Sequence, residues 1–184
     1  TRQVVADLIA YLDTDIDAGT NYRPNMADWR EGSWSGRSTA HGIERRGDTA
    51  VELETLRKIG EAMTTVPEHM TLNPKLTRII ETRAARIREG DGIDWATAEH
   101  LAFGALLLEG DPVRLSGQDS CRGTFSQRHA VLVDQATEER YAPLSHLSEG
   151  QAMFEVIDSP LSEASVMGFE YGFSQAEPNA LVMW

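Results

Sequence analysis

The chain has 184 residues, and its 41% hydrophobic and 25% charged residues are typical of folded globular proteins rather than disordered ones. Its formal net charge of −12 argues against non-specific binding to nucleic acid or anionic lipid. The longest apolar run, at 101–108, is far shorter than the roughly 20 residues that span a membrane. The only cysteine, Cys121, rules out an intrachain disulfide and favours a reducing compartment.

The first half of the chain, residues 1–92, is predicted to consist of helices and extended segments. Apolar residues recur at helical spacing in three stretches, over residues 2–12, 49–64 and 73–88. The arginines of the last stretch predict a solvent-exposed face, with a phosphate-binding patch as the alternative. Residues 20–47 mix Gly, Pro, Asn and Ser with aromatic residues, which predicts an extended arm anchored by Trp29 and Trp34.

The second half, residues 93–184, is predicted to be an α/β unit. Apolar runs and turn residues predict alternating elements, namely a helix at 93–110, strands at 112–117, 131–135 and 152–159, a helix at 160–176 and a strand at 180–184. Strands that are apolar nearly throughout are typical of a parallel sheet with both faces covered. Because the chain starts at Thr1 and stops inside the apolar run NALVMW, we expect an internal piece of a longer chain.

Several familiar motifs are only partly present. Gly-Asp-Gly at 90–92 opens the metal-diphosphate signature of thiamine enzymes, but the next asparagine, Asn179, comes far too late to complete it. We therefore expect EGDGIDW, residues 89–95, to end one helix and to cap the next with Asp94. The GSWSG run has Trp34 where a nucleophile elbow needs serine. The five histidines lack the close His/Cys pairing of a zinc site, and Cys121 lacks a definite histidine partner for a catalytic thiol.

The loop 116–129 gathers polar side chains after the carboxyl end of a predicted strand, where ligands of open α/β sheets bind. Its charged and hydrogen-bonding side chains are Gln118, Asp119, Arg122, Thr124, Gln127, Arg128 and His129. A purely structural loop would hold fewer such groups. We expect this loop to be functional.

Glu163 stands among small and apolar residues near the start of the last predicted helix. With Ser159 as the cap and Pro160 as the first helical residue, an acid in this turn is favoured by the helix dipole. A second interpretation follows from Gly168 and Gly172, which predict that the helix packs closely against neighbouring backbone. An acid desolvated there needs a hydrogen-bonding partner.

Long specific stretches carry a family resemblance, including YRPNMADWREGSWSG, DWATAEHLAFGALLLEG, VRLSGQDSCRGTFSQRHAVLVDQ and DSPLSEASVMGFEYGFSQAEPNALVMW. Through them, nearly the whole chain closely resembles the thiamine diphosphate-dependent, decarboxylating first components of 2-oxoglutarate dehydrogenase complexes. The resemblance implies a helical connector over residues 1–92. It also implies that residues 93–184 form the first half of a transketolase-like pyrimidine-binding domain, with a parallel sheet and flanking helices.

The resemblance implies roles for individual residues. In the family, a glutamate at the position of Glu163 hydrogen-bonds a ring nitrogen of the cofactor's aminopyrimidine and so helps activate the cofactor. Leu161 falls where the family places an apolar residue that holds the bent cofactor. Gln118 aligns with a loop position near the cofactor. His129 and Arg122 are candidates for contacting the dicarboxylate substrate.

The implied cofactors are thiamine diphosphate and Mg²⁺, and we expect the metal ligands outside this chain. The implied partners are 2-oxoglutarate, a second copy in a homodimer, and dihydrolipoyl succinyltransferase, whose lipoyl groups receive the succinyl group. The expected location is the cytoplasm of a bacterium, or the mitochondrial matrix in a eukaryote. Three alternatives stay open: a paralogue acting on 2-oxoadipate, a non-oxidative 2-oxoglutarate decarboxylase, and a non-catalytic dimerisation module.

Overall fold

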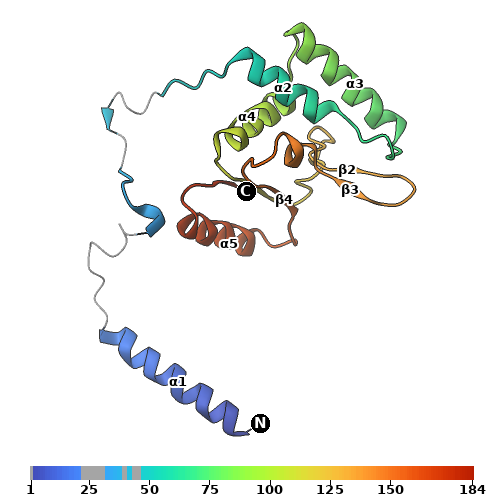
Figure 1. Cartoon of the computed structure of the whole chain (residues 1–184). Coiled ribbons are helices and arrows are strands. Elements are labelled where there is room, and N and C mark those ends of the chain that lie inside the picture. Colours follow the sequence, from blue (N-terminus) through green and yellow to red (C-terminus); the bar gives the residue numbers. More distant parts are fainter. Residues whose placement is uncertain (1, 22–31, 39–40, 43–46) are drawn as a thin grey trace. The chain divides into compact units, whose positions relative to one another are not determined.

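The computed structural model describes residues 2–21, 32–38, 41–42 and 47–184 (Figure 1). The chain divides into two compact units, Thr1–Ala40 and His41–Trp184. The first unit holds the helix α1 (Arg2–Asn21) and the short 3-10 helix η2 (Gly32–Trp34).

The helix α1 is longer than the helix predicted at 2–12, because helical backbone continues through the acidic residues that follow. Its apolar side chains are exposed, as Leu8 illustrates. Of the two tryptophans predicted to anchor an extended arm, Trp34 ends η2, while Trp29 lies outside the described residues.

Three helices open the second unit: α2 (Leu53–Thr64), α3 (Pro74–Glu89) and α4 (Trp95–Glu109). Their ends follow local side-chain chemistry. Asn73 caps α3 by accepting a hydrogen bond from the backbone N–H of Lys75, and Asp94 caps α4 by accepting from that of Thr97. Gly90 ends α3 with a left-handed φ of 73°. The prediction that the Gly-Asp-Gly stretch ends one helix and leads to the cap of the next is confirmed.

Two glycines allow α2 to pack against both of the other helices. A Cβ on Gly60 would lie 2.4 Å from Cγ2 of Ile87, on α3. A Cβ on Gly104, on α4, would lie 2.3 Å from Cγ2 of Ile59, on α2. Both distances are too short for real carbon atoms, so an alanine at either position would force the helices apart.

The described part of the second unit contains a parallel sheet, as predicted, and its strands lie in the order β4-β1-β5. Its strands are β1 (Val113–Gly117), β4 (Phe154–Asp158) and β5 (Leu181–Met183), and β1 pairs in parallel with both others. Side chains alternate along β1. Val113 and Leu115 join the core that includes Phe103 of α4. Arg114 points to the other face, where it bonds Glu170 of the helix α5 (Glu163–Ala176).

The strand predicted at 131–135 does not belong to the parallel sheet. Instead β2 (Leu132–Val133) pairs antiparallel with β3 (Arg140–Tyr141), a strand that the sequence pattern did not predict. The short 3-10 helix η4 (Pro143–His146) follows β3. The two strands are too short for an apolar pattern to show, and the turn between them fixes their pairing.

Two clusters of apolar side chains stabilise the second unit. The larger lies among α2, α4, η4 and the sheet; its buried members include Ile59, Met63, Phe103, Leu107, Val113, Leu115, Leu144 and Phe154. The smaller joins α3 to the β2–β3 ribbon through Met70, Ile80 and Leu132. Together they fix α3 and α4 beside the loop that connects β1 to β2.

Asp134 organises the turn between β2 and β3 as a carboxylate. It accepts hydrogen bonds from the backbone N–H groups of Thr71 at 2.6 Å, Thr137 at 2.7 Å and Ala136 at 2.8 Å. These bonds favour the ionised form and hold the pKa of Asp134 at about 2, below its ordinary value of 3.8.

Substituting Asp134→Asn is therefore expected to lower the free energy of unfolding at neutral pH. Because the folded-state pKa is depressed, the stability that this carboxylate contributes is present above about pH 4. That contribution is lost as the pH falls toward the folded-state value, so the wild type and the variant should converge there. Urea unfolding over a pH series measures the difference, with the exposed Glu149→Gln as control. A stability gap that stays constant down to pH 2.5 (about midway in the transition) would contradict the assignment.

Candidate active site

The carboxyl ends of the three parallel strands meet at one edge of the sheet, because parallel strands all point the same way. Gln118 follows β1, Ser159 follows β4 and Trp184 follows β5. These three residues border a hollow of about 210 Å³, which Pro160, Glu163 and Val166 also line. This edge is where open parallel α/β sheets bind ligands.

Glu163 is the first residue of α5, so the helix begins three residues later than predicted. Ser162 is the N-cap, with an extended φ of −154°, and its carbonyl accepts the first helical hydrogen bond from the N–H of Val166 at 3.0 Å. The prediction that Ser159 caps the helix is wrong. Its hydroxyl donates to the carbonyl of Pro160 instead, because residues 159–162 form a bend between β4 and the helix.

The Glu163 side chain is exposed, and no hydrogen bond or ion pair joins its carboxylate to another described residue. The expected desolvated setting is therefore not provided by the described residues of this chain. The expectation that Gly168 and Gly172 bring α5 against neighbouring backbone is also wrong within them, because a Cβ at either position would have no atom within 4 Å. The carboxylate remains available to a ligand in the hollow.

A buried ion pair fixes α5 on the sheet. Nε of Arg114 lies 2.7 Å from Oε2 of Glu170, and its Nη2 lies 2.9 Å from Oε1, so the pair is bidentate. The guanidinium also bonds Glu155 of β4 and lies over the ring of Phe173. The hydrogen bonds to Glu170, opposed by burial, raise the pKa of Arg114. The role of Glu170 is to anchor the helix that carries Glu163.

The first part of the loop 116–129 is held by local polar contacts. Asp119 adopts a left-handed φ of 53°, and its carboxylate accepts hydrogen bonds from the exposed guanidinium of Arg122, with Nε 3.1 Å from Oδ2. This bonding raises the pKa of Arg122. The N–H of Cys121 donates to Oδ1 of Asp158 at 2.9 Å. Burial and the neighbouring Asp158 raise the pKa of the Cys121 thiol, which disfavours the reactive thiolate.

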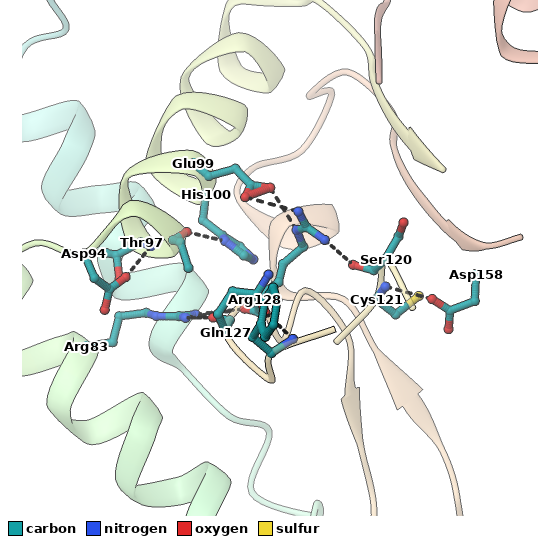
Figure 2. Close-up of polar contacts among 12 residues, drawn as sticks. Arg83, Asp94, Thr97, Glu99, His100, Ser120, Cys121, Gln127, Arg128 and Asp158 are labelled. Atoms are coloured by element: carbon teal, nitrogen blue, oxygen red, sulfur yellow. Dashed lines mark hydrogen bonds and ion pairs between the residues drawn. The ribbon is translucent and has the colours of Figure 1, made fainter. Parts of the chain in front are cut away.

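The last part of the loop is held by two arginines (Figure 2). Arg128 pairs with Glu99 of α4 at 2.8 Å and donates to the carbonyl of Ser120 at 3.0 Å. Arg83 of α3 donates to the carbonyls of Gln127 and Arg128. Arg83 is only 5% exposed, so the prediction that the arginines of α3 form a solvent-exposed face is wrong for this residue.

The structure brings together two of the site residues predicted from the sequence. Gln118 and Glu163 line the same hollow. Leu161 precedes α5, is 86% exposed and does not line it. Arg122 is paired with Asp119, and burial lowers the pKa of His129; neither residue lines the hollow.

The sequence reasoning missed Trp184 as a lining residue, although it ends the strand predicted at 180–184 in the parallel sheet. The rule that placed ligands beyond the carboxyl end of β1 applies to β5 as well. Residues 2–21, 32–38, 41–42 and 47–184 contain no close group of three His, Cys, Asp or Glu side chains that could hold a metal ion. Within the same ranges, every helix is too short or too polar to cross a membrane.

Comparison with known proteins shows close relatives along almost the entire chain. The chain is 52% identical, over 94% of its length, to the 2-oxoglutarate dehydrogenase E1 component of Brucella anthropi. It is 50% identical, over 97% of its length, to the proteins of the same name from Brucella canis and Brucella melitensis. The chain spans 18% of the length of each of these relatives.

The family described as transketolase, pyrimidine binding domain, matches residues 91–184. This segment contains α4, the parallel sheet, the loop 116–129 and α5, and therefore every residue that borders the hollow. The match covers more than half of the chain and agrees with the parallel α/β arrangement. The chain belongs to the transketolase pyrimidine-binding domain family.

Proposed function

We propose that this chain is part of a 2-oxoglutarate dehydrogenase E1 component, which decarboxylates 2-oxoglutarate and passes the succinyl group to lipoyl groups. The observation that carries the proposal is the extent of the identity to proteins of that name. It covers 94–97% of the chain and so includes the connector, beyond the segment shared with the wider family. Residues 1–92 are proposed to be the connector and residues 93–184 the first half of the pyrimidine-binding domain.

The hollow beside Glu163 fits the pyrimidine end of thiamine diphosphate, the cofactor that this family implies. Its volume of about 210 Å³ suits a six-membered ring, and the aromatic residue Trp184 is among the residues that line it. The free carboxylate of Glu163 can share a proton with a ring nitrogen, and the N-terminus of α5 stabilises its negative charge. Bound thiamine diphosphate supplies an electron sink for decarboxylation of a 2-oxo acid.

The other candidate residues keep their proposed roles. Leu161 is positioned on the bend before α5, where its exposed side chain can contact the cofactor, and Gln118, which lines the hollow, can hydrogen-bond it. His129 and Arg122 are proposed to contact the carboxylates of 2-oxoglutarate. In the full enzyme, we propose that Mg²⁺ binds through residues outside this chain.

The proposed partners are a second copy of the protein and dihydrolipoyl succinyltransferase, in the cytoplasm of a bacterium. Support for a homodimer comes from α5, where Met167 and Tyr171, four residues apart and so on one face of the helix with Glu163, are exposed large side chains. A second protomer covering this face would also desolvate Glu163. The carboxylate would then acquire the dry setting that its proposed chemistry needs.

The test is an activity assay of the full-length protein with thiamine diphosphate and Mg²⁺. We expect kcat/KM for 2-oxoglutarate to exceed that for 2-oxoadipate by roughly 10-fold or more, because one methylene group discriminates by 10–200-fold in a fitted pocket. Succinyl transfer to a lipoyl domain should accompany turnover. The 184-residue chain alone should be inactive, since it carries only part of the site.

Each alternative predicts a different result in this assay. Preference for 2-oxoadipate would identify a paralogue, and carbon dioxide release without lipoyl acylation would identify a non-oxidative decarboxylase. Turnover by the isolated chain would contradict the division of the active site proposed above. Failure of the full-length protein to decarboxylate either acid would favour a dimerisation module.

A further inference from the structure

Arg83 is a buried cation on a helix whose other basic side chains are at least partly exposed. The helix α3 also carries Lys75, Arg78 and Arg88 on its surface, and these are the residues that make its sequence look solvated. Arg83 instead lies between α3, α4 and the end of the loop 116–129 (Figure 2). Burying a guanidinium is costly unless hydrogen bonds compensate, so its contacts point to a specific role.

Those contacts go to backbone carbonyls of the loop. Nη2 of Arg83 donates to the carbonyl of Gln127 at 3.0 Å, and Nη1 and Nη2 both lie 3.4 Å from the carbonyl of Arg128. No ion pair joins Arg83 to a carboxylate in the described residues, since Asp94 pairs with Arg86 and Glu99 pairs with Arg128. The guanidinium is therefore used to hold a length of backbone.

The backbone that Arg83 holds has a conformation that needs support. Ser126 and His129 both adopt left-handed φ values, 53° and 50°, which are unfavourable for residues other than glycine. The carbonyls of Gln127 and Arg128 lie between these two residues. The N–H of His129 closes the loop by donating to the carbonyl of Arg122 at 3.0 Å. The guanidinium of Arg83, by bonding these two carbonyls, restrains the backbone of both Ser126 and His129.

The side chain presented by this backbone is His129. Its Nε2 is buried and has no hydrogen-bond partner in the described residues, so this nitrogen calls for a partner that they do not supply. The charged groups around it are Arg83 from α3 and Arg122 and Asp119 from its own loop. Burial is the largest cause that lowers the pKa of His129; a hydrogen bond with the backbone of Ser126 opposes it, and the positive charge of Arg83 lowers the pKa further.

We propose that Arg83 is a positioning residue of the active site, which sets the placement of His129 for binding the 2-oxo acid by holding the carbonyls of Gln127 and Arg128. The inference rests on the proposed function, because it takes His129 as a substrate-binding group. Arg83 itself touches no reacting atom. Arg83 is on α3, in the proposed connector. A helix outside the segment that matches the family therefore determines the conformation of the loop 116–129.

The experiment compares Arg83→Met and Arg83→Lys in the full-length protein, with Arg78→Met as the matched control. Arg78 lies on the same helix, is exposed and loses the same charge on substitution. In Arg83→Met, we expect KM for 2-oxoglutarate to rise about 10-fold or more, because sub-ångström misplacement is enough to weaken binding. Binding of thiamine diphosphate should stay within about twofold of the wild type, and the control should match the wild type.

The pH profile separates positioning from general destabilisation. Removing the positive charge of Arg83 raises the pKa of His129, so in Arg83→Met the acid limb of kcat/KM should move to higher pH. Arg83→Lys keeps the charge but offers an ammonium group in place of a planar fork. We therefore expect its acid limb to stay near the wild-type position while KM still rises.

Some results would overturn the proposal. One is an unchanged KM for 2-oxoglutarate in both Arg83 variants, with any loss of rate explained by a loss of folded protein. Another is a rise in KM in Arg78→Met equal to that in Arg83→Met. If Arg83→Met does not fold, Arg83→Lys decides through KM alone.

Amide hydrogen exchange tests the backbone-holding role of Arg83 separately from the proposed enzymatic activity. If the wild type does not turn over 2-oxoglutarate, the functional proposal and the role of His129 in it fail. Even in that case, the amides of His129 and Ala130 should exchange at least about 10-fold faster in Arg83→Met than in the wild type. The reason is that their hydrogen bonds to the carbonyls of Arg122 and Cys121 would loosen. Unchanged exchange would refute the backbone-holding role itself.

Discussion

Replacing Glu163 with glutamine in the full-length protein is expected to lower turnover of 2-oxoglutarate by about 10²–10⁴-fold, the range for losing a proton-transferring group. Glutamine keeps the size and the hydrogen-bonding capacity of the side chain but cannot share a proton with a ring nitrogen. The loss should appear in kcat, measured at saturating thiamine diphosphate. The fold should be retained, because Glu163 makes no bond to another described residue.

The matched control for this prediction is Glu54→Gln. Glu54 is an acid in the first turn of α2, as Glu163 is in α5, so both substitutions remove a similar interaction with a helix dipole. Each should change the free energy of unfolding by no more than about 1 kcal/mol. A Glu163→Gln enzyme with near-normal turnover would mean that Glu163 is only a first-turn acid, and the catalytic assignment would be wrong.

Substituting Arg114→Met is expected to destabilise the protein by about 3–5 kcal/mol, the usual cost of removing one partner of a buried ion pair. The carboxylate of Glu170 would remain buried beside an apolar side chain, since the Glu170 side chain is only 6% exposed. Chemical denaturation measures the loss. The double variant Arg114→Met with Glu170→Leu should recover most of it, because no charge is then left unpaired on α5.

An exposed pair provides the comparison. Arg86 and Asp94 lie 3.3 Å apart with both side chains more than 40% exposed, so Arg86→Met should cost less than about 1 kcal/mol. If Arg114→Met and Arg86→Met cost the same, the buried pair does not anchor α5 as described. The comparison also bears on catalysis, since loosening α5 would move Glu163.

The sequence predicted the elements whose signals are local. Capping by Asp94, for example, follows from a side chain that reaches only three residues along the chain. The start of α5 was misplaced, because Ser159-Pro160 and Ser162 are both good helix starts and the bend after β4 selects the second. The strand β3 was missed because two residues are too few to show a period.

The site was predicted to the extent that topology alone determines it. Gln118 and Glu163 meet because both follow the carboxyl ends of parallel strands, and that rule needs no side-chain detail. The partners of Arg83, Arg114 and Arg122 depend on contacts between distant residues or on loop conformation, which composition cannot show. The local sequence around an arginine does not show whether its side chain is solvated or buried, either on a basic helix or in an apolar strand.

The bonding of Arg114 has a consequence for the evolution of this protein. Its two acidic partners lie 41 and 56 residues further along the chain, yet neither the cation nor Glu170 can be replaced singly without stranding a charge. Positions 114 and 170 should therefore vary as a unit among descendants of a common ancestor, and a lineage that lost one would quickly fix a change at the other.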